Sequence, residues 1–114
     1  MANNDVFTIN LDKERTLKFR RKELKLLEKS LGKKITKIDF NDIGIDDISK
    51  MIHLALQHED ESLTLEQVEA LMDNSEMYFG EMNEAVMKAF AVSMGGPKAL
   101  ERFEEITDIQ EAKN

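Results

Sequence analysis

Apolar and polar residues alternate over residues 7–11 and again over 16–19, and apolar residues then recur every three or four positions. Phe7, Ile9 and Leu11 alternate with polar neighbours, and the alternation resumes at Leu17 and Phe19 after a short polar stretch. A period of two is typical of a half-buried strand. The pattern predicts an antiparallel hairpin, and helices must cover its apolar face because a lone hairpin is unstable in water.

Helical spacing begins near Arg21. Leu24, Leu27 and Leu31 follow at intervals of three and four, and Gly32 stands where a left-handed C-terminal cap is expected. We therefore predict a first helix that ends at this glycine.

A second helix is predicted after an irregular connector that starts at residue 35. It begins at Gly44 or Asp46 and places a row of apolar residues on one side: Ile48, Met51, Ile52 and Ala55.

The third helix has the clearest start signal in the chain. Thr64 and Gln67 are spaced as a capping box, and Leu63 and Val68 can form a hydrophobic staple around it. The pattern predicts a helix from Leu65 to about Met72.

The fourth predicted helix, about 76–94, is the most apolar. It is expected to end at Gly95-Gly96-Pro97. Its apolar arc spans roughly 220°, about twice the width that a surface helix needs. We expect this helix to be central, with Phe79, Val86 and Phe90 on its core side, although the whole arc being core is the competing interpretation. The flank at Met87, with Met82 and Met94, is expected to be its exposed portion. The candidate partner-binding residues are Met82, Met87, Met94 and Phe90, because flexible methionines suit surfaces that accept varied apolar sequences.

Together these elements predict a mainly helical α+β fold, with an N-terminal β-hairpin packed against about four helices. We expect one domain over residues 1–96. Residues 97–114 are acidic and weakly amphipathic, and they are predicted to be either a C-terminal tail or a weakly docked helix.

Charge divides the chain sharply. Residues 1–37 hold eleven Lys/Arg against five Asp/Glu, whereas residues 38–114 hold five against eighteen, for a formal net charge of −7. Such a split favours self-association or a charged partner, with Arg20, Arg21 and Lys22 as the candidate contacts. The acidic total disfavours general nucleic-acid binding, although this basic N-terminal face leaves a small nucleic-acid-contacting regulator as the alternative function.

Several kinds of chemistry are not expected. The absence of Cys excludes disulfides and thiolate metal sites. Residues 39–50 begin like a calcium loop, but Ile43 and Lys50 stand where ligands are needed. His53 and His58 are five residues apart, so on a helix they cannot share a metal ion. We therefore predict no enzyme, no metal and no cofactor. With no signal peptide or membrane span either, a cytosolic protein is expected.

The order of elements resembles the tail assembly chaperones of long-tailed phages, particularly those of Gram-positive hosts. The resemblance covers about residues 5–96. It rests on Leu17-Lys18-Phe19, on Leu24-Lys25-Leu26-Leu27-Glu28-Lys29-Ser30-Leu31-Gly32, on Leu54-Ala55-Leu56-Gln57-His58-Glu59-Asp60, on Leu63-Thr64-Leu65-Glu66-Gln67-Val68 and on Met94-Gly95-Gly96. The long acidic ending departs from the family's pattern.

The resemblance implies a non-catalytic protein of the host cytoplasm. It would bind the apolar, helical tape measure protein and keep it soluble while tube subunits assemble, and it would be absent from the finished virion. The family also implies a longer frameshifted form, joined after Gly95, that recruits the tail tube protein. Self-association into a homo-oligomer is expected from the charge split, and a virion-resident adaptor is a further alternative.

Overall fold

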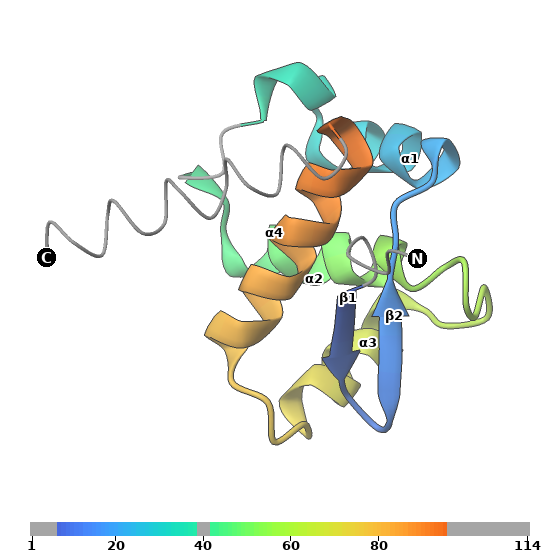
Figure 1. The fold of residues 1–114 in the computed structure, drawn as a ribbon, viewed down its shortest axis with the longest axis vertical. Helices are drawn as coiled ribbons and strands as arrows, with labels where there is room; N and C mark the ends of the chain where they lie inside the picture. Colours follow the sequence, from blue (N-terminus) through green and yellow to red (C-terminus); the bar gives the residue numbers. More distant parts are fainter. Residues whose placement is uncertain (1–6, 39–41, 96–114) are drawn as a thin grey trace, which may run out of the picture.

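The computed structural model describes residues 7–38 and 42–95 (Figure 1). Its elements are β1 (Phe7–Asn10), β2 (Glu14–Leu17), α1 (Arg21–Leu31), the 3-10 helix η1 (Ile35–Lys37), α2 (Ile45–Ala55), α3 (Leu65–Asp73) and α4 (Phe79–Gly95). The predicted fold class, a mainly helical α+β fold with an N-terminal hairpin, is confirmed. Residues 96–114, and with them the predicted tail, lie outside the described residues.

The hairpin has one apolar face and one solvated face. β1 and β2 pair antiparallel with Phe7 opposite Leu17 and Ile9 opposite Arg15, so these four side chains share a face. Arg15 is the exception to the apolar pattern. It is buried, and its guanidinium donates to both carboxylate oxygens of Asp12, at 2.8 and 2.9 Å. These hydrogen bonds lower the pKa of Asp12 to about 2, and they tie the turn to the second strand.

Helices cover the apolar face of the hairpin. α4 packs across both strands, while α2 contacts β2, α1, α3 and α4 and so occupies the centre of the molecule. Figure 1 shows α4 crossing in front of α2, with the hairpin beside them. The buried side chains form one core: Ile9, Leu17, Phe19, Leu27, Ile48, Met51, Ile52, Leu54, Ala55, Leu56, Val68, Met82, Val86, Met87, Ala89 and Phe90.

The loop after α2 protects the outer edge of β2. The Thr16 N–H donates to a Glu59 carboxylate oxygen at 2.9 Å, and His58 Nε2 donates to the Thr16 carbonyl at 2.8 Å. Side chains thus take the place of a third strand, which matters because an open strand edge invites pairing with other chains.

All four α-helices in the described part of the chain begin with the same device. The side chain of the third helical residue accepts a hydrogen bond from the backbone N–H of the residue before the helix. The pairs are Glu23 with Arg20 at 2.8 Å, Asp47 with Gly44 at 3.4 Å, Gln67 with Thr64 at 2.9 Å and Glu81 with Tyr78 at 3.0 Å. Only the Thr64–Gln67 start is predicted from the sequence as a capping box. The others lack a capping hydroxyl, so each acid fixes the helix start by itself.

The predicted helices match the structure closely except at the start of α4. The sequence predicts this helix from about residue 76, but it begins at Phe79. The preceding segment is held to the hairpin instead, because the Ser75 hydroxyl donates to the Asn10 carbonyl and accepts from the Met77 N–H at 3.0 Å. The predicted cap at Gly32 is confirmed, with a φ of 69°.

Glu23 has the most constrained carboxylate of these helix starts. Its side chain is buried, and it accepts three hydrogen bonds from Arg20, one from the backbone and two from the guanidinium. Burial raises the pKa of Glu23, but the hydrogen bonds and positive charge of Arg20 outweigh burial, so the net shift is downward.

Replacing Glu23 by Gln should lower the free energy of unfolding at pH 7 by about 1–2 kcal/mol, because an amide cannot keep the charge-assisted bonds to Arg20. Since the folded pKa is lowered, ionised Glu23 stabilises the fold above the usual Glu pKa of about 4.3. That contribution is lost as the pH falls through the folded pKa. Urea denaturation should therefore show the wild type and the variant converging at low pH. Glu14→Gln, at an exposed carboxylate on β2, is the control and should change little at either pH.

Candidate functional site

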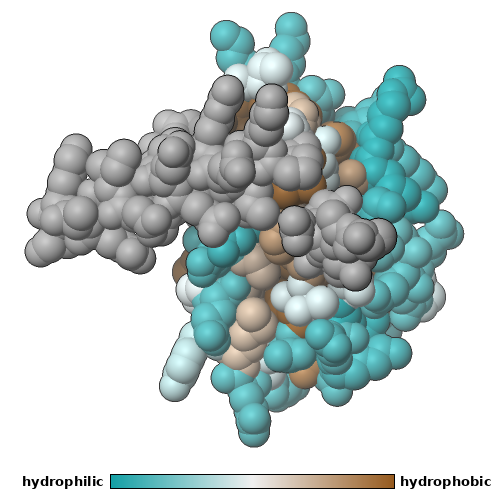
Figure 2. Space-filling view, in the orientation of Figure 1, coloured by the Kyte–Doolittle hydropathy of each residue, from teal (hydrophilic) through white to brown (hydrophobic). Residues whose placement is uncertain are grey.

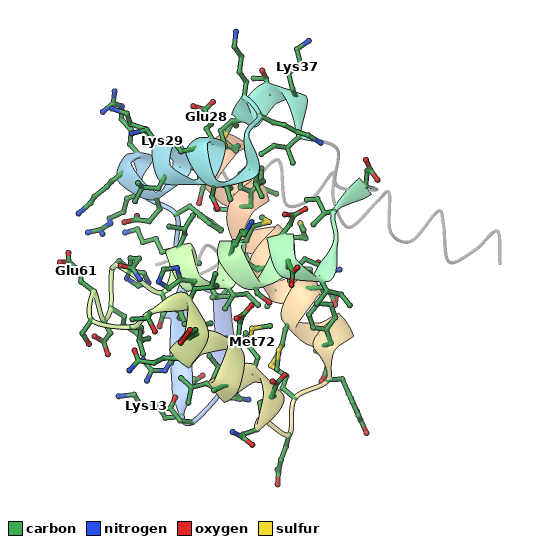
Figure 3. The ribbon with its side chains drawn as sticks, turned by 180° about the vertical axis from the view of Figure 1, so that it is seen from behind. Lys13, Glu28, Lys29, Lys37, Glu61 and Met72 are labelled. Atoms are coloured by element: carbon green, nitrogen blue, oxygen red, sulfur yellow. The ribbon has the colours of Figure 1, made fainter. Side chains whose placement is uncertain are left out.

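An open cleft lies where the start of α2, the end of α3 and the start of α4 meet. Its volume is about 540 Å³. Its apolar lining comes from Ile45, Met72, Met77, Tyr78, Phe79 and Met82, and its polar lining from Asp46, Ser49, Glu69, Asp73 and Ser75. Figure 3 shows Met72 facing the first turns of α4, with sulfur atoms gathered between the two helices.

Three of the five large apolar side chains that are exposed among the described residues lie at this cleft. Tyr78 is 78% exposed, Ile45 69% and Phe79 38%. Only two further large apolar residues of residues 7–38 and 42–95 are exposed, Leu26 on α1 and Met94 at the end of α4, and neither lines the cleft. Three exposed apolar side chains around one hollow make this cleft the candidate site, because exposed apolar residues elsewhere on a surface are normally scattered singly.

The floor of the cleft is deformable. Met72, Met77 and Met82 all line it, so three of the seven methionines of the chain meet at one place. Methionine is unbranched and polarizable, and it adapts to irregular apolar shapes. The cleft can therefore accept apolar side chains of more than one shape.

The rim of the cleft is acidic. Asp46, Glu69 and Asp73 line it, and among residues 7–38 and 42–95 no Lys or Arg does. Glu69 and Asp73 are four residues apart on α3, where like charges repel. Asp73 is also the last residue of that helix, at the negative end of its dipole, and the last turn holds no basic residue. The local electrostatics of α3 thus favour a cation supplied from outside.

The structure places most of the predicted partner-binding residues elsewhere than expected. Met82, Met87 and Phe90 are buried, and only Met94, 46% exposed, is on the surface. The prediction that Met82 and Met87 lie on an exposed flank of the fourth helix is wrong, because α2 and the hairpin cover both flanks. Phe90 packs edge-to-face on Phe19, with ring centroids 5.8 Å apart. Met82 still reaches the cleft as part of its floor.

Sequence reasoning missed the exposed residues at the cleft. Phe79 was expected in the core, while Tyr78 and Ile45 were not singled out as surface. Ile45 continues the stripe of α2, and Phe79 continues the stripe of α4, but both stand at helix ends. A helical stripe extends past the core where the neighbouring element stops, and the sequence pattern has no signal for that point.

The predicted basic contacts do not form one free patch. The Arg20 guanidinium pairs with Glu23, whereas Arg21 and Lys22 are exposed at the start of α1. Other lysines extend this basic face: Figure 3 shows Lys29 and Lys37 at the end of the molecule away from Met72. The basic face and the acid-rimmed cleft are therefore separate surfaces.

On the face shown in Figure 2, apolar residues form a band that follows α4 between hydrophilic surfaces. This view agrees with the central position of α4, most of whose large apolar side chains belong to the core.

The two histidines hold backbone segments together. His53 Nε2 hydrogen-bonds to the Leu63 carbonyl at 2.9 Å, and His58 Nε2 to the Thr16 carbonyl at 2.8 Å. Both side chains are half-buried. In the part of the chain that the structure describes, no group of three or more possible ligands is placed to hold a metal ion. None of the described helices combines the length and apolarity needed to cross a bilayer.

Comparison of the chain with protein-family models, with curated proteins and with solved structures finds no match. Function is therefore inferred from the residues and from their geometry.

Truncation of two methionines of α4 should change the free energy of unfolding to very different extents. Met82→Ala should lower the free energy of unfolding by about 2–4 kcal/mol, because it removes buried contacts and leaves a cavity. Met94→Ala should change it by no more than about 0.5 kcal/mol, because this side chain is largely exposed. Urea denaturation of both variants measures the difference. Equal losses would mean that α4 is not packed as described.

Proposed function

We propose that the chain is a non-catalytic tail assembly chaperone, which binds apolar helical segments of a tape measure protein in the cytoplasm of the infected cell. The observation that supports this function best is the open cleft at which Ile45, Tyr78 and Phe79 are exposed together. The sequence resemblance to this family, described above, points to the same class of client.

The proposed mode of binding is a helix in a groove. A client helix presents apolar residues at intervals of three and four, and these residues enter a hollow whose walls are apolar side chains. Covering them removes the client's apolar surface from water, which is what otherwise drives it to aggregate.

A small contact area suits this task, because a chaperone of an assembling tail must release its client. The cleft is formed by three helix ends and is about 540 Å³ in volume, so binding at one cleft is expected to be weak and reversible. Several copies along one long client then hold it through many such contacts. In this proposal a longer form, extended after Gly95, brings in the tail tube protein.

Co-expression with the tape measure protein of the same genome tests the function. The wild-type chain should move the tape measure protein from the insoluble to the soluble fraction. The double variant Ile45→Ser with Tyr78→Ser should lose most of this effect while it folds normally, because both side chains are largely exposed. Gel analysis of the two fractions measures the outcome.

Leu26→Ser is the matched control, since Leu26 is an exposed apolar residue on α1, outside the cleft. It should solubilise the client as the wild type does. A client that stays equally insoluble with and without the wild-type chain would refute the chaperone function, and equal loss in the control would refute the assignment to the cleft.

We also propose that the chain self-associates through its opposite charges. Residues 7–38 hold eleven Lys/Arg and four Asp/Glu, whereas residues 42–95 hold two and twelve. The exposed Arg21 and Lys22 of one copy are then attracted to the acidic surface of another.

Sedimentation velocity should show oligomers that become smaller as salt rises from about 0.05 to 0.5 M, because screening shortens the reach of exposed charges. Reversing both charges, Arg21→Glu with Lys22→Glu, should have the same effect at low salt. Lys13→Glu, at an exposed position of the hairpin turn, should be milder. A monomer at every salt concentration would contradict self-association.

A further inference from the structure

The cleft combines two properties, apolar walls and an acidic rim. Its walls are apolar and rich in methionine, while its rim holds Asp46, Glu69 and Asp73, and no Lys or Arg of the described part of the chain lines it. A partner that fits both properties presents an apolar row with positive charge beside it. We propose that the cleft selects an amphipathic helix whose apolar stripe is flanked by Lys or Arg, and this inference rests on the proposed function because it specifies the client's chemistry.

The two acids that α3 contributes to the rim, Glu69 and Asp73, have no basic residue on their own helix. Glu69 and Asp73 repel each other across one turn of α3, and that helix has no basic residue in its last turn. The Lys or Arg residues of a bound helix offset the repulsion between Glu69 and Asp73 and the unfavourable position of Asp73 at the negative end of the helix dipole. Glu or Asp residues of a bound helix add to both effects. Charge complementarity therefore discriminates between helices with equal apolar stripes, chiefly by rejecting acidic ones.

The aromatic residues at the rim strengthen the preference. Tyr78 is the most exposed large apolar residue of the described chain, and it follows Met77, one of the methionines that line the cleft. Its ring can pack on the apolar stem of a Lys or Arg while the charged head reaches an acidic residue, because these long side chains are apolar along their stems.

Two other occupants fit the cleft less well. The first is α1 of a second copy, which is basic. Within the described residues it exposes one large apolar side chain, Leu26, and this side chain would fill little of a cleft that six apolar residues line. Residues 97–114 of the same chain hold five Asp/Glu against three Lys/Arg, so the acidic rim repels them. A basic amphipathic helix from a different protein satisfies both the walls and the rim.

Three synthetic peptides test the preference against the full-length chain by fluorescence anisotropy. The first has Leu and Met at positions i, i+3, i+4 and i+7 with Lys and Arg at the flanks. The second has the same apolar positions with Glu at the flanks, and the third is a scrambled form of the first. The basic amphipathic peptide should bind about tenfold more tightly than the acidic one at low salt, and the difference should narrow as salt rises. The scrambled peptide should bind weakly.

Variants assign the preference to the cleft. Glu69→Gln with Asp73→Asn should bring the two amphipathic peptides within about threefold of each other. Tyr78→Ser should weaken both. The matched control, Glu14→Gln with Glu61→Gln, removes two exposed charges outside the cleft and should keep the full preference. Circular dichroism checks that each variant folds.

Three results would overturn the proposal: equal binding of the basic and acidic peptides, equal binding of the scrambled peptide, or equal effects of the rim and control pairs. If no peptide binds and Tyr78→Ser abolishes self-association, the cleft holds a second copy and the proposal is wrong. The peptide preference and the co-expression result are independent readouts. A preference without solubilised tape measure protein refutes the proposed function and leaves the chemistry of the cleft in place.

Discussion

Covering the apolar face of a two-stranded hairpin is the constraint on which the rest of this structure depends. A hairpin of two four-residue strands is unstable alone, so α4 and α2 must pack against it. This packing takes up the centre of α4, from Met82 to Phe90, and places Phe90 on Phe19. The middle of α4, the most apolar helix, is consequently buried in the core, and large apolar side chains of α4 are exposed only near its two ends.

The position of the cleft follows from that constraint. α2, α3 and α4 have different lengths and directions, so their ends do not finish in one plane. Ile45 and Phe79 continue buried stripes beyond the point where the neighbouring helix covers them. A binding surface made in this way needs no special motif. Its apolar side chains continue the buried stripes of α2 and α4, and they are exposed because the neighbouring helix ends before it covers them.

The charged residues of the described chain differ in whether they are paired within the fold. The buried charges Arg15 and Glu23 are each paired within three residues, so they stabilise the hairpin turn and the start of α1. Glu69 and Asp73, in contrast, line a cleft to which the described residues contribute no Lys or Arg. Acids that oppose their own helix dipole lower stability slightly, which is consistent with a role outside the fold.

The sequence by itself determined the elements and which side of each is apolar. Alternation at Phe7, Ile9 and Leu17 marked the hairpin, and the Thr64–Gln67 spacing marked α3, because both signals act over a few neighbouring residues. Tertiary structure alone decided how far each apolar stripe is covered. It buried Met82 and Met87, and it exposed Ile45, Tyr78 and Phe79. Periodicity gives the direction of a side chain around its helix, but burial depends on the length and position of the neighbouring element, which no local pattern contains.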